Sequence, residues 1–373
     1  MEDNPTQLSD TEQVDWLRLV RTPSTGPRTF IELIERYGSP AAAIAELPEI
    51  TQRARRKRRL VAPPEVDMRA ELSRLDAAGG RMIAHSDPDY PAALAAIADP
   101  PPALFVKGDS TLLNNPTIAI VGARNASTNG KRFAQEIAAD LANAGYVIVS
   151  GLAHGVDGAA HLRALATGTI AAVAGGIDVV YPPEHAELQA RIGETGAVVS
   201  DQAIGTQPTA RHFPARNRII SGLSAGVLVM EAALKSGSLI TARLALEQGR
   251  DVFAVPGSPR DPRCGGTNDL IRQGASLTET AEDILEGLER QMLRPPPAPR
   301  RPISFEPVEL KAEIEPVSGD DEIIKFLGAS PTGVDELVRE CHMSAASVKS
   351  ILLELELSGR IERHSGNRVS LIL

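Results

Sequence analysis

The chain has 373 residues, of which 42% are hydrophobic and 23% are charged, as is typical of a globular protein with two or three domains. Its net charge of −9 excludes a protein covered in positive potential, so any nucleic-acid site must be local. Aromatic residues make up only 3% of the chain, which excludes a stacking platform of many rings. Cys264 and Cys341 form no CxxC pair and are expected to be reduced thiols.

The first 75 residues predict a small helical domain. Helical periodicity covers residues 11–20, 29–37 and 40–47, with short Pro/Gly turns between them. The basic run from Arg53 to Arg59 is either a solvated helix face or a face that contacts phosphate. The acidic N-terminus lacks the features of a signal peptide, and no apolar run approaches the ~20 residues of a membrane helix. We therefore expect a cytoplasmic protein without a membrane span.

From residue 80 to residue 290, short apolar runs alternate with helical stretches. The expected strands are 118–121, 146–150, 170–174, 197–200, 226–230 and 252–255. The expected helices include 132–144, 158–166, 239–248 and 281–288. Continuous apolar strands separated by helices are typical of a parallel sheet that is covered on both faces. The sequence therefore predicts an α/β domain with an extended Rossmann-like, mostly parallel sheet.

Residues 293–317 predict a linker, because seven prolines lie between Arg294 and Pro316 without a sustained period. The last segment, residues 318–373, predicts a winged helix, with three helices and then a hairpin. The expected helices are 320–327, 334–339 and 345–357, and the expected strands are 361–363 and 369–373. Nine acidic residues outnumber six Lys and Arg in this segment, so it suits a protein contact at least as well as weak DNA binding.

Loops rich in Gly, Ser and Arg follow three of the expected strands and open a helix. In an open α/β sheet, ligands bind beyond the carboxyl ends of the strands, where such loops meet. Three loops of this kind on one edge predict a cradle for a polyanion. The residues expected to line it are Gly122, Arg124, Ser150, Gly151, Ser236, Gly237 and Ser238.

Two stretches over these loops contain no acidic residue. They are residues 110–135 and 202–230, although 48 of the 373 residues are Asp or Glu. A phosphate backbone requires such a surface, because a like charge beside it weakens binding, although buried strands account for part of the gap. Within the second stretch, residues 211–218 predict a loop in which a ring lies between cations, which suits base stacking beside phosphate contacts. Alternatively, the ring only anchors this loop in the core. The candidate contacts are Arg211, Phe213, Arg216, Asn217 and Arg218.

Motifs of catalytic, metal and cofactor sites are missing from the sequence. No GxGxxG is present, and Asn129-Gly-Lys-Arg132 lacks the first glycine and the Ser/Thr of a P-loop. His154, Asp157 and His161 lie close together, but no HExxH, cysteine pair or GxSxG accompanies them, which favours helix capping. We therefore expect no catalytic residue, no metal and no cofactor.

Eight motifs follow one another between residues 110 and 275. They are Val121-Gly-Ala-Arg124, Ser150-Gly-Leu-Ala-His-Gly-Val-Asp157, Gly175-Gly-Ile-Asp178 with Tyr181-Pro182, Phe213-Pro-Ala-Arg-Asn-Arg-Ile-Ile-Ser-Gly-Leu-Ser224, Glu231-Ala232, Ser236-Gly-Ser-Leu-Ile-Thr-Ala242, Gly249-Arg-Asp-Val-Phe-Ala-Val-Pro-Gly257 and Gly266-Thr-Asn-Asp-Leu-Ile271. In this order and combination, they resemble the DprA (DNA-processing protein A, or Smf) family. The family commonly has Ser-Glu-Tyr where this chain has Ser200-Asp-Gln202.

The resemblance implies a non-enzymatic protein that binds single-stranded DNA. It also implies loading of RecA onto incoming strands, past single-strand-binding protein, during natural transformation in competence, and a homodimer formed through the Rossmann-like domain. The helical N-terminus is similar to the SAM-like or helix-hairpin-helix extensions of some members, and the tail to their winged helix. The DNA contacts that the resemblance implies are Arg124, Arg211, Phe213, Arg216, Asn217, Arg218, Lys235, Ser236, Gly237 and Ser238.

Two other functions are open on the sequence alone. Phosphoribohydrolases of the lysine-decarboxylase-like type, which process nucleotides, use a related sheet with a Gly-rich turn and a catalytic Glu. Glu231 and Gly265-Gly-Thr267 are the nearest equivalents here, but their spacing departs from PGGxGTxxE. A regulator of double-stranded DNA would instead bind through residues 318–373.

Overall fold

The computed structural model describes residues 7–53, 60–293, 323–324, 326–328, 331–341, 343–364 and 366–372. Apart from residues 53 and 293, the predicted basic run and the predicted linker lie outside the described residues. The chain divides into two units by its contacts. Unit 1 comprises Met1–Val20 and Pro63–Glu289, and unit 2 comprises Arg21–Ala62 and Arg290–Leu373. The predicted N-terminal helices are thus shared between both units.

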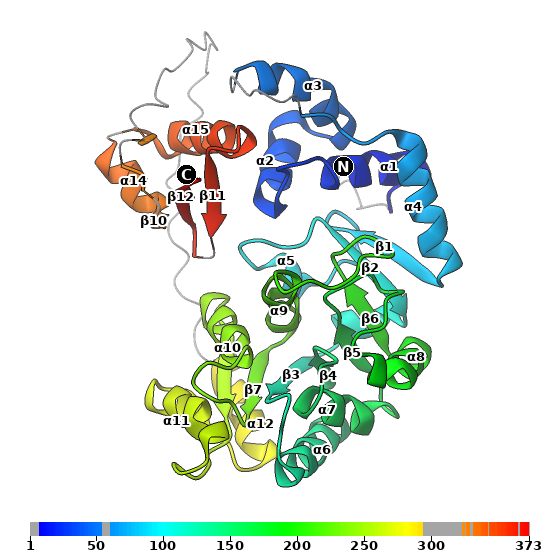
Figure 1. The fold of residues 1–373 in the computed structure, drawn as a ribbon, viewed down its shortest axis with the longest axis vertical. Coiled ribbons are helices and arrows are strands. Elements are labelled where there is room, and N and C mark those ends of the chain that lie inside the picture. Colours follow the sequence, from blue (N-terminus) through cyan, green and yellow to red (C-terminus); the bar gives the residue numbers. More distant parts are fainter. Residues whose placement is uncertain are drawn as a thin grey trace. The chain divides into compact units, whose positions relative to one another are not determined.

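Unit 1 is built on a nine-stranded sheet with the order β1-β2-β6-β5-β4-β3-β7-β8-β9 (Figure 1). All neighbours from β6 to β9 pair in parallel, whereas β1–β2 and β2–β6 pair antiparallel. The predicted mostly parallel α/β fold is therefore confirmed, although β1, β2 and β9 were not among the predicted strands. The strands are β1 (Gly80–Ala84), β2 (Ala103–Gly108), β3 (Thr117–Gly122), β4 (Val147–Ser150), β5 (Thr169–Ala172), β6 (Ala197–Ser200), β7 (Gly226–Met230), β8 (Asp251–Ala254) and β9 (Ser276–Leu277).

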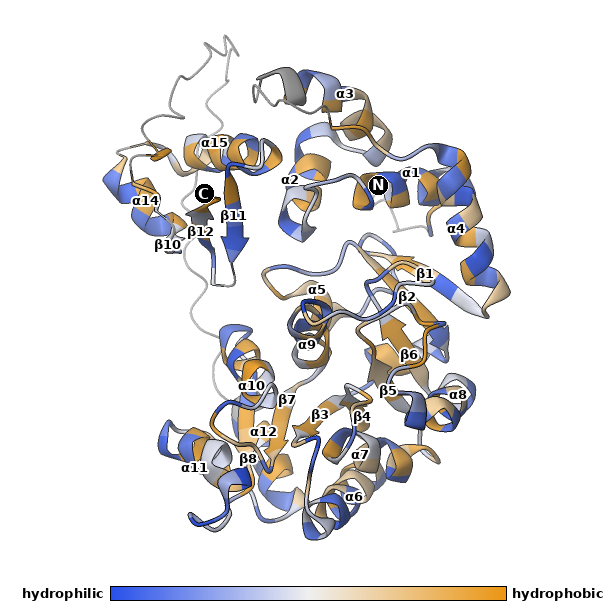
Figure 2. Ribbon diagram, viewed as in Figure 1, coloured by the Kyte–Doolittle hydropathy of each residue, from blue (hydrophilic) through white to orange (hydrophobic). Residues whose placement is uncertain are grey.

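Helices cover both faces of this sheet, as the apolar strands in Figure 2 require. Successive residues of β3 point to opposite faces: Ile118 and Ile120 belong to one core, Ala119 and Val121 to the other. The first core is closed by α6, α7 and α12, the second mainly by α9 and α10. The helices of unit 1 are α1 (Asp10–Val20), α4 (Glu65–Ala77), α5 (Ala92–Ala95), α6 (Thr128–Asn143), α7 (Val156–Ala164), α8 (Ala186–Thr195), α9 (His212–Leu223), α10 (Ser238–Glu247), α11 (Gly265–Arg272) and α12 (Ala281–Leu293), with short 3-10 turns at Ser110–Asn114, Pro183–His185 and Pro262–Cys264.

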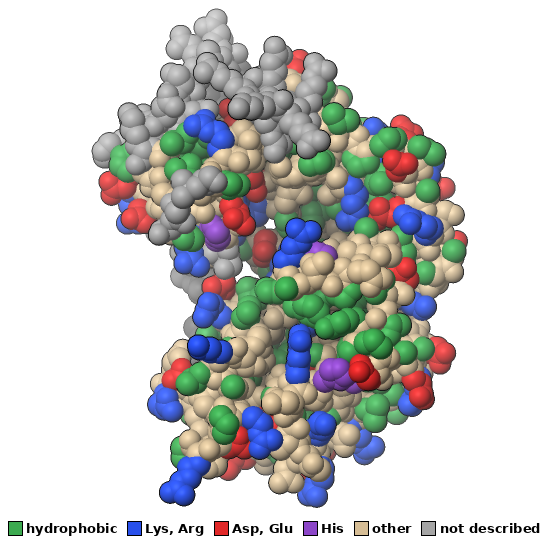
Figure 3. Space-filling view, in the orientation of Figure 1, with side chains coloured by type: hydrophobic (Ala, Val, Ile, Leu, Met, Phe, Trp, Pro, Cys, Tyr) green, Lys and Arg blue, Asp and Glu red, His purple; other side chains and the backbone are tan. Residues whose placement is uncertain are grey.

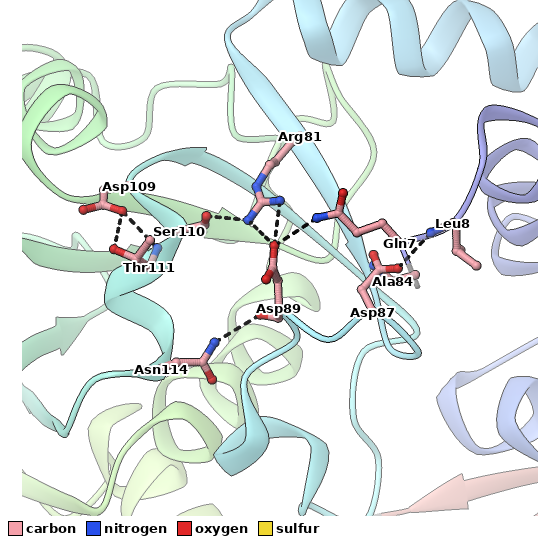
Figure 4. A network of polar contacts seen from close by, with 10 residues as sticks. All are labelled: Gln7, Leu8, Arg81, Ala84, Asp87, Asp89, Asp109, Ser110, Thr111 and Asn114. Atoms are coloured by element: carbon pink, nitrogen blue, oxygen red, sulfur yellow. Dashed lines mark hydrogen bonds and ion pairs between the residues drawn. The ribbon is translucent and has the colours of Figure 1, made fainter. Parts of the chain in front are cut away.

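A polar network fastens the first described residues to the edge of the sheet at β1 (Figure 4). The Asp87 carboxylate accepts hydrogen bonds from the backbone N–H groups of Leu8 and Ala84. Asp89 accepts from Gln7 and from both Nη atoms of Arg81. Because backbone donors at a sheet edge otherwise stay unpaired, Asp87 satisfies one such donor at the end of β1, and both carboxylates hold the segment before α1.

Unit 2 contains a winged helix, which confirms that prediction. Its strands form an antiparallel sheet with the order β10-β12-β11. The predicted helix at 320–327 lies largely outside the described residues. The elements of unit 2 are α2 (Pro27–Tyr37), α3 (Pro40–Arg53), β10 (Thr332–Gly333), α14 (Val334–Glu340), α15 (Ala345–Leu357), β11 (Ile361–His364) and β12 (Arg368–Leu371). Among the helices of the described residues, none is long and apolar enough to cross a membrane.

Candidate nucleic-acid interface

The direction in which the chain builds the sheet reverses between β3 and β7. From β3 the chain adds β4, β5 and β6 on one side, and it then returns to add β7, β8 and β9 on the other. The loops that follow β3 and β7 therefore leave for different parts of the sheet. In open α/β sheets this is where ligands bind, outside the carboxyl ends of the strands.

Helix α9 replaces the loop that we predicted at residues 211–218, so this prediction was wrong. The helix begins at His212, and Arg211 occupies its N-cap position. Pro214 does not interrupt it, because proline is tolerated in the first turn, where no helical hydrogen bond is lost. The three arginines consequently differ in exposure: Arg211 is exposed, whereas Arg216 and Arg218 are buried.

An aromatic and cationic cluster forms where two loops approach α9. Arg124, in the loop after β3, places its guanidinium 5.2 Å from the centre of the Phe213 ring. Tyr181, in the loop after β5, packs its ring 5.4 Å from the Phe213 ring. Arg124 and Tyr181 are exposed and Phe213 is half-buried, so two rings and a cation are open to solvent together. Tyr181 belongs to one of the family motifs but was not predicted as a DNA contact, because its place beside Phe213 arises only from the fold.

Beneath this cluster lies Arg216, which is only 4% exposed. Its Nε–H has no hydrogen-bond partner among the described residues. A Cβ at Gly151 would overlap its guanidinium, so only glycine leaves room there. Burial lowers the pKa of Arg216 to about 10, while Asp157 raises it and Arg124 lowers it. The guanidinium is therefore charged at neutral pH although a donor is left without an acceptor, an arrangement that favours an incoming anion.

Asp157 attracts Arg216 but its carboxylate is already engaged. Its Oδ2 accepts hydrogen bonds from the N–H groups of Gly151 at 3.1 Å and Ala153 at 3.4 Å. Burial raises the pKa of Asp157, and the Arg216 charge and these hydrogen bonds lower it. The carboxylate thus shapes the loop after β4 and positions Arg216 rather than neutralising it fully.

Arg218 takes a structural position instead of the phosphate contact expected from the sequence. Its Nη2 forms an ion pair of 2.8 Å with Asp201, and its Nη1 donates to the Asp99 carbonyl. With the side chain only 10% exposed, the guanidinium is committed to these partners. Asp201 lies in the Ser200-Asp-Gln202 segment, where the chain differs from the family that its motifs resemble, and it holds α9 through Arg218.

The start of α6 is likewise occupied, so the predicted polyanion cradle is closed on that side. Ser127 caps the helix, and both its N–H (2.7 Å) and its hydroxyl donate to the Glu231 carboxylate. Glu231 adopts a φ of +44°, which few non-glycine residues do. This carboxylate takes the place that a phosphate would take at the helix N-terminus. Because its oxygens already accept hydrogen bonds from Ser127, Glu231 does not have the free carboxylate of a catalytic base.

The other predicted contacts differ in how accessible they are. Lys235 is exposed, Asn217 is half-buried, and the hydroxyls of Ser236 and Ser238 lie 2.7 Å apart in one hydrogen bond at the start of α10. Ser150 is fully buried and donates to a backbone carbonyl. A Cβ at Gly122 would overlap the Met230 carbonyl, so this glycine allows β3 and β7 to approach.

The three side chains considered for a metal are separated by the fold. His161 is fully buried, with Nδ1 2.9 Å from the Thr169 hydroxyl, while His154 lies near the surface with Nε2 3.5 Å from the Glu184 carboxylate. The described residues contain no group of three side chains that could hold a metal ion.

A cavity of about 550 Å³ adjoins Arg124. Figure 3 shows Lys and Arg, His and hydrophobic side chains close together on this face of unit 1. Acidic side chains also line the cavity, so it is of mixed charge. Its polar lining includes Lys131, Gln135, His154, Glu184, His185 and Arg191.

Comparisons with known families cover nearly the whole chain. The family described as DNA recombination-mediator protein A matches residues 81–289. A DprA-like N-terminal HHH domain matches residues 10–73, and a DprA winged helix domain matches residues 309–367.

Individual relatives agree with these matches. The chain is 37% identical to Protein Smf of Escherichia coli, over 95% of each chain. It is 48% identical to the DNA processing protein DprA of Bacillus subtilis, over 56% of this chain and 72% of that one. Among solved structures, it is similar to DprA of Streptococcus pneumoniae, with a TM-score of 0.63 and 33% identity over 75% of this chain and 98% of that one. It is also similar to DprA of Helicobacter pylori, whose structure describes a single-stranded DNA binding mode, with a TM-score of 0.52 and 32% identity over 57% and 96% of the two chains.

Proposed function

The chain belongs to the DNA recombination-mediator protein A family, and we propose that it binds single-stranded DNA where α9 meets the loops after β3 and β4. Members of this family are DNA-binding recombination mediators, and the names of the relatives state no enzymatic activity. A mediator requires a site that holds a strand without changing it. The proposed site has cations and rings but no arrangement that would cleave or modify a nucleotide.

The observation that carries the proposal is the buried, charged guanidinium of Arg216. A buried cation whose N–H donor has no acceptor destabilises the fold unless an anion binds to it and accepts that hydrogen bond. A phosphate oxygen supplies such an acceptor, and guanidinium groups match its geometry well. Arg216 lies at the bottom of the site and attracts phosphate from below, while the exposed Arg124 and Arg211 attract the strand from solution.

The rings explain the preference for a single strand. Phe213 and Tyr181 are within 5.4 Å of each other and present apolar surface beside Arg124. Bases of a single strand can leave their own stack and pack on such rings, whereas bases of a duplex cannot. Stacking depends little on base identity, so we propose binding with weak sequence preference and a steep dependence on salt. The single-stranded DNA binding mode described for the Helicobacter pylori relative supports this proposal.

We further propose that the protein loads RecA onto the bound strand past single-strand-binding protein, in the cytoplasm, during natural transformation. The description of the family as a recombination mediator supports the loading step. We also propose a homodimer formed through unit 1. In support, β9 is an edge strand of the nine-stranded sheet, and its Leu277 is 48% exposed.

A gel-shift titration with a labelled oligo-dT strand tests the site. Arg124→Glu combined with Arg211→Glu should weaken binding at least a hundredfold, because two cations beside phosphate become two repelling charges. Arg163→Glu is the matched control, since this exposed arginine lies near the end of α7, away from the carboxyl ends of the strands. Unchanged binding by the double variant would show that the strand lies elsewhere. RecA filament formation on strands covered by single-strand-binding protein tests the loading step separately.

A further inference from the structure

The winged helix has a second buried apolar surface, which lies outside its own hydrophobic core. Val348, Ile351, Leu352 and Leu355 of α15 belong to the winged-helix core. Leu353 and Leu357 do not, yet they are only 5% and 0% exposed. Leu353 and Leu357 are one helical turn apart, so they form an apolar stripe on another face of α15.

Helices α2 and α3 of the same unit cover this stripe. Leu33 and Tyr37 of α2 and Ile50 of α3 line a hollow together with Leu353 and Leu357. The hollow measures only about 10 Å³, so the surfaces fit closely.

Charged groups surround the apolar contact. Arg363 of β11 lies 2.9 Å from Glu356 of α15 and 3.1 Å from Glu32 of α2. Glu356 also accepts a hydrogen bond of 2.6 Å from the Thr29 hydroxyl. The three charged side chains are 11%, 15% and 22% exposed, so the pairs are shielded from solvent and salt. Arg28 donates a further hydrogen bond to Asn367 at the rim.

This face of α15 is the one by which a winged helix would read DNA. In such domains the third helix enters the major groove with the side that points away from the core. Here that side carries Leu353, Glu354 and Leu357, with a single cation, Lys349, one turn before Leu353. Two leucines and a carboxylate give a phosphate backbone little to bind. Its chemistry fits an amphipathic helix pair that offers an apolar stripe and an acid for Arg363.

We propose that the outward face of α15, together with Arg363, is a protein-binding surface, and that its resident partner is the helix pair α2–α3 of the same chain. The contact joins two segments of unit 2 that lie far apart in the sequence. Any other molecule that binds α15 must first displace α2–α3. The proposal is independent of the single-strand site in unit 1.

Cross-linking of the full chain tests it. Arg28→Cys and Asn367→Cys place two thiols where the side chains now meet at 3.1 Å, and the natural cysteines are buried. A short bis-maleimide should join them within one chain, to a level absent from either single variant. No product above these controls would overturn the contact. Cross-linked dimers instead of cross-linked monomers would overturn the assignment to the same chain.

Two matched substitutions sharpen the test. Glu32→Gln removes a partner of Arg363 and should slow cross-linking roughly tenfold, whereas Glu35→Gln, at an exposed position of the same helix, should leave the rate within about twofold. Equal rates for both would contradict the proposed role of the ion pairs. Excess duplex DNA should not change the yield. If it abolishes the cross-link, duplex DNA displaces α2–α3 from α15, and the assignment of this face to protein binding in place of DNA binding is wrong. As a second readout, Leu357→Ala should speed hydrogen exchange of the α2 amides, and unchanged exchange would count against the contact.

Discussion

Replacing Arg216 by Met should make the free protein more stable and the DNA complex much weaker. Met is unbranched and reaches about as far as the Nε of the arginine, and it removes the charge. Burial is the main reason that the pKa of Arg216 is lowered to about 10. At about 1.4 kcal/mol per unit, holding the charge in the fold costs about 3 kcal/mol at neutral pH. Because the pKa of this base is lowered on folding, the cost is present at every pH below about 10.

Replacing Arg216 also affects Asp157, because the Asp157 carboxylate then loses the attraction of the Arg216 charge. The double variant Asp157→Asn/Arg216→Met removes both buried charges and should gain about 2–3 kcal/mol in unfolding free energy. The bound state should suffer instead. A lost charged hydrogen bond to phosphate costs about 2–3 kcal/mol, or roughly 30- to 150-fold in affinity.

Urea unfolding of the free protein and titration with oligo-dT at several salt concentrations measure the two effects. If Arg216 contacts phosphate, the slope of log affinity against log salt should fall by about one charge in Arg216→Met. Arg163→Met serves as the control in both assays. A variant that is less stable than the wild type and binds DNA with the same affinity and salt slope would refute the assignment, because Arg216 would then be a cation satisfied within the fold.

Three further predictions follow from other contacts of unit 1. Phe213→Ala should weaken oligo-dT binding by about 1–3 kcal/mol without changing the salt slope, whereas Phe326→Ala, an exposed phenylalanine of unit 2, should have no effect in the same titration. Arg218→Ala should lower the unfolding free energy by about 3 kcal/mol, because it breaks the ion pair with Asp201. The salt dependence of DNA binding should have the same slope as in the wild type. A flatter slope would mean that Arg218 contacts phosphate. Burial lowers the pKa of His161 to about 3, so the folded protein keeps it neutral while the unfolded chain binds a proton below about pH 6.5, and stability is lost as the pH falls through this range. His161→Phe should therefore remove about 2 kcal/mol of the loss in unfolding free energy between pH 7 and pH 5, as urea titrations at both values would show.

The parallel sheet could be predicted because its strands are buried on both faces and their sequences are continuously apolar. The antiparallel strands β1 and β2 could not, since Gly80–Ala84 contains Arg81 and only three apolar residues follow it. Helix α9 was predicted as a loop because its buried face is partly charged: Arg216 and Arg218 lie where an amphipathic helix normally has apolar residues.

Within the site, the residues could be identified from the sequence, but the role of each residue could not. Arg124 and Phe213 were found from local composition, and the fold brings them within 5.2 Å. Whether an arginine faces a ligand or an acid depends on residues far along the chain. Glu231 and Ser127 are 104 positions apart, and no local pattern indicates that this carboxylate closes the start of α6. The contact between α2 and α15 joins still more distant segments, so no sequence window contains it.

The claim that this chain holds single-stranded DNA at the α9 site is tested most directly by competition. Labelled oligo-dT bound to the full chain is displaced with unlabelled single strand or with duplex of the same length, and the measurement is repeated with Arg124→Glu/Arg211→Glu. We expect the single strand to compete at a concentration at least a hundredfold lower than the duplex, and the variant to lose the bound oligo-dT. Equal competition by the duplex, or retention of the strand by the variant, would contradict the account.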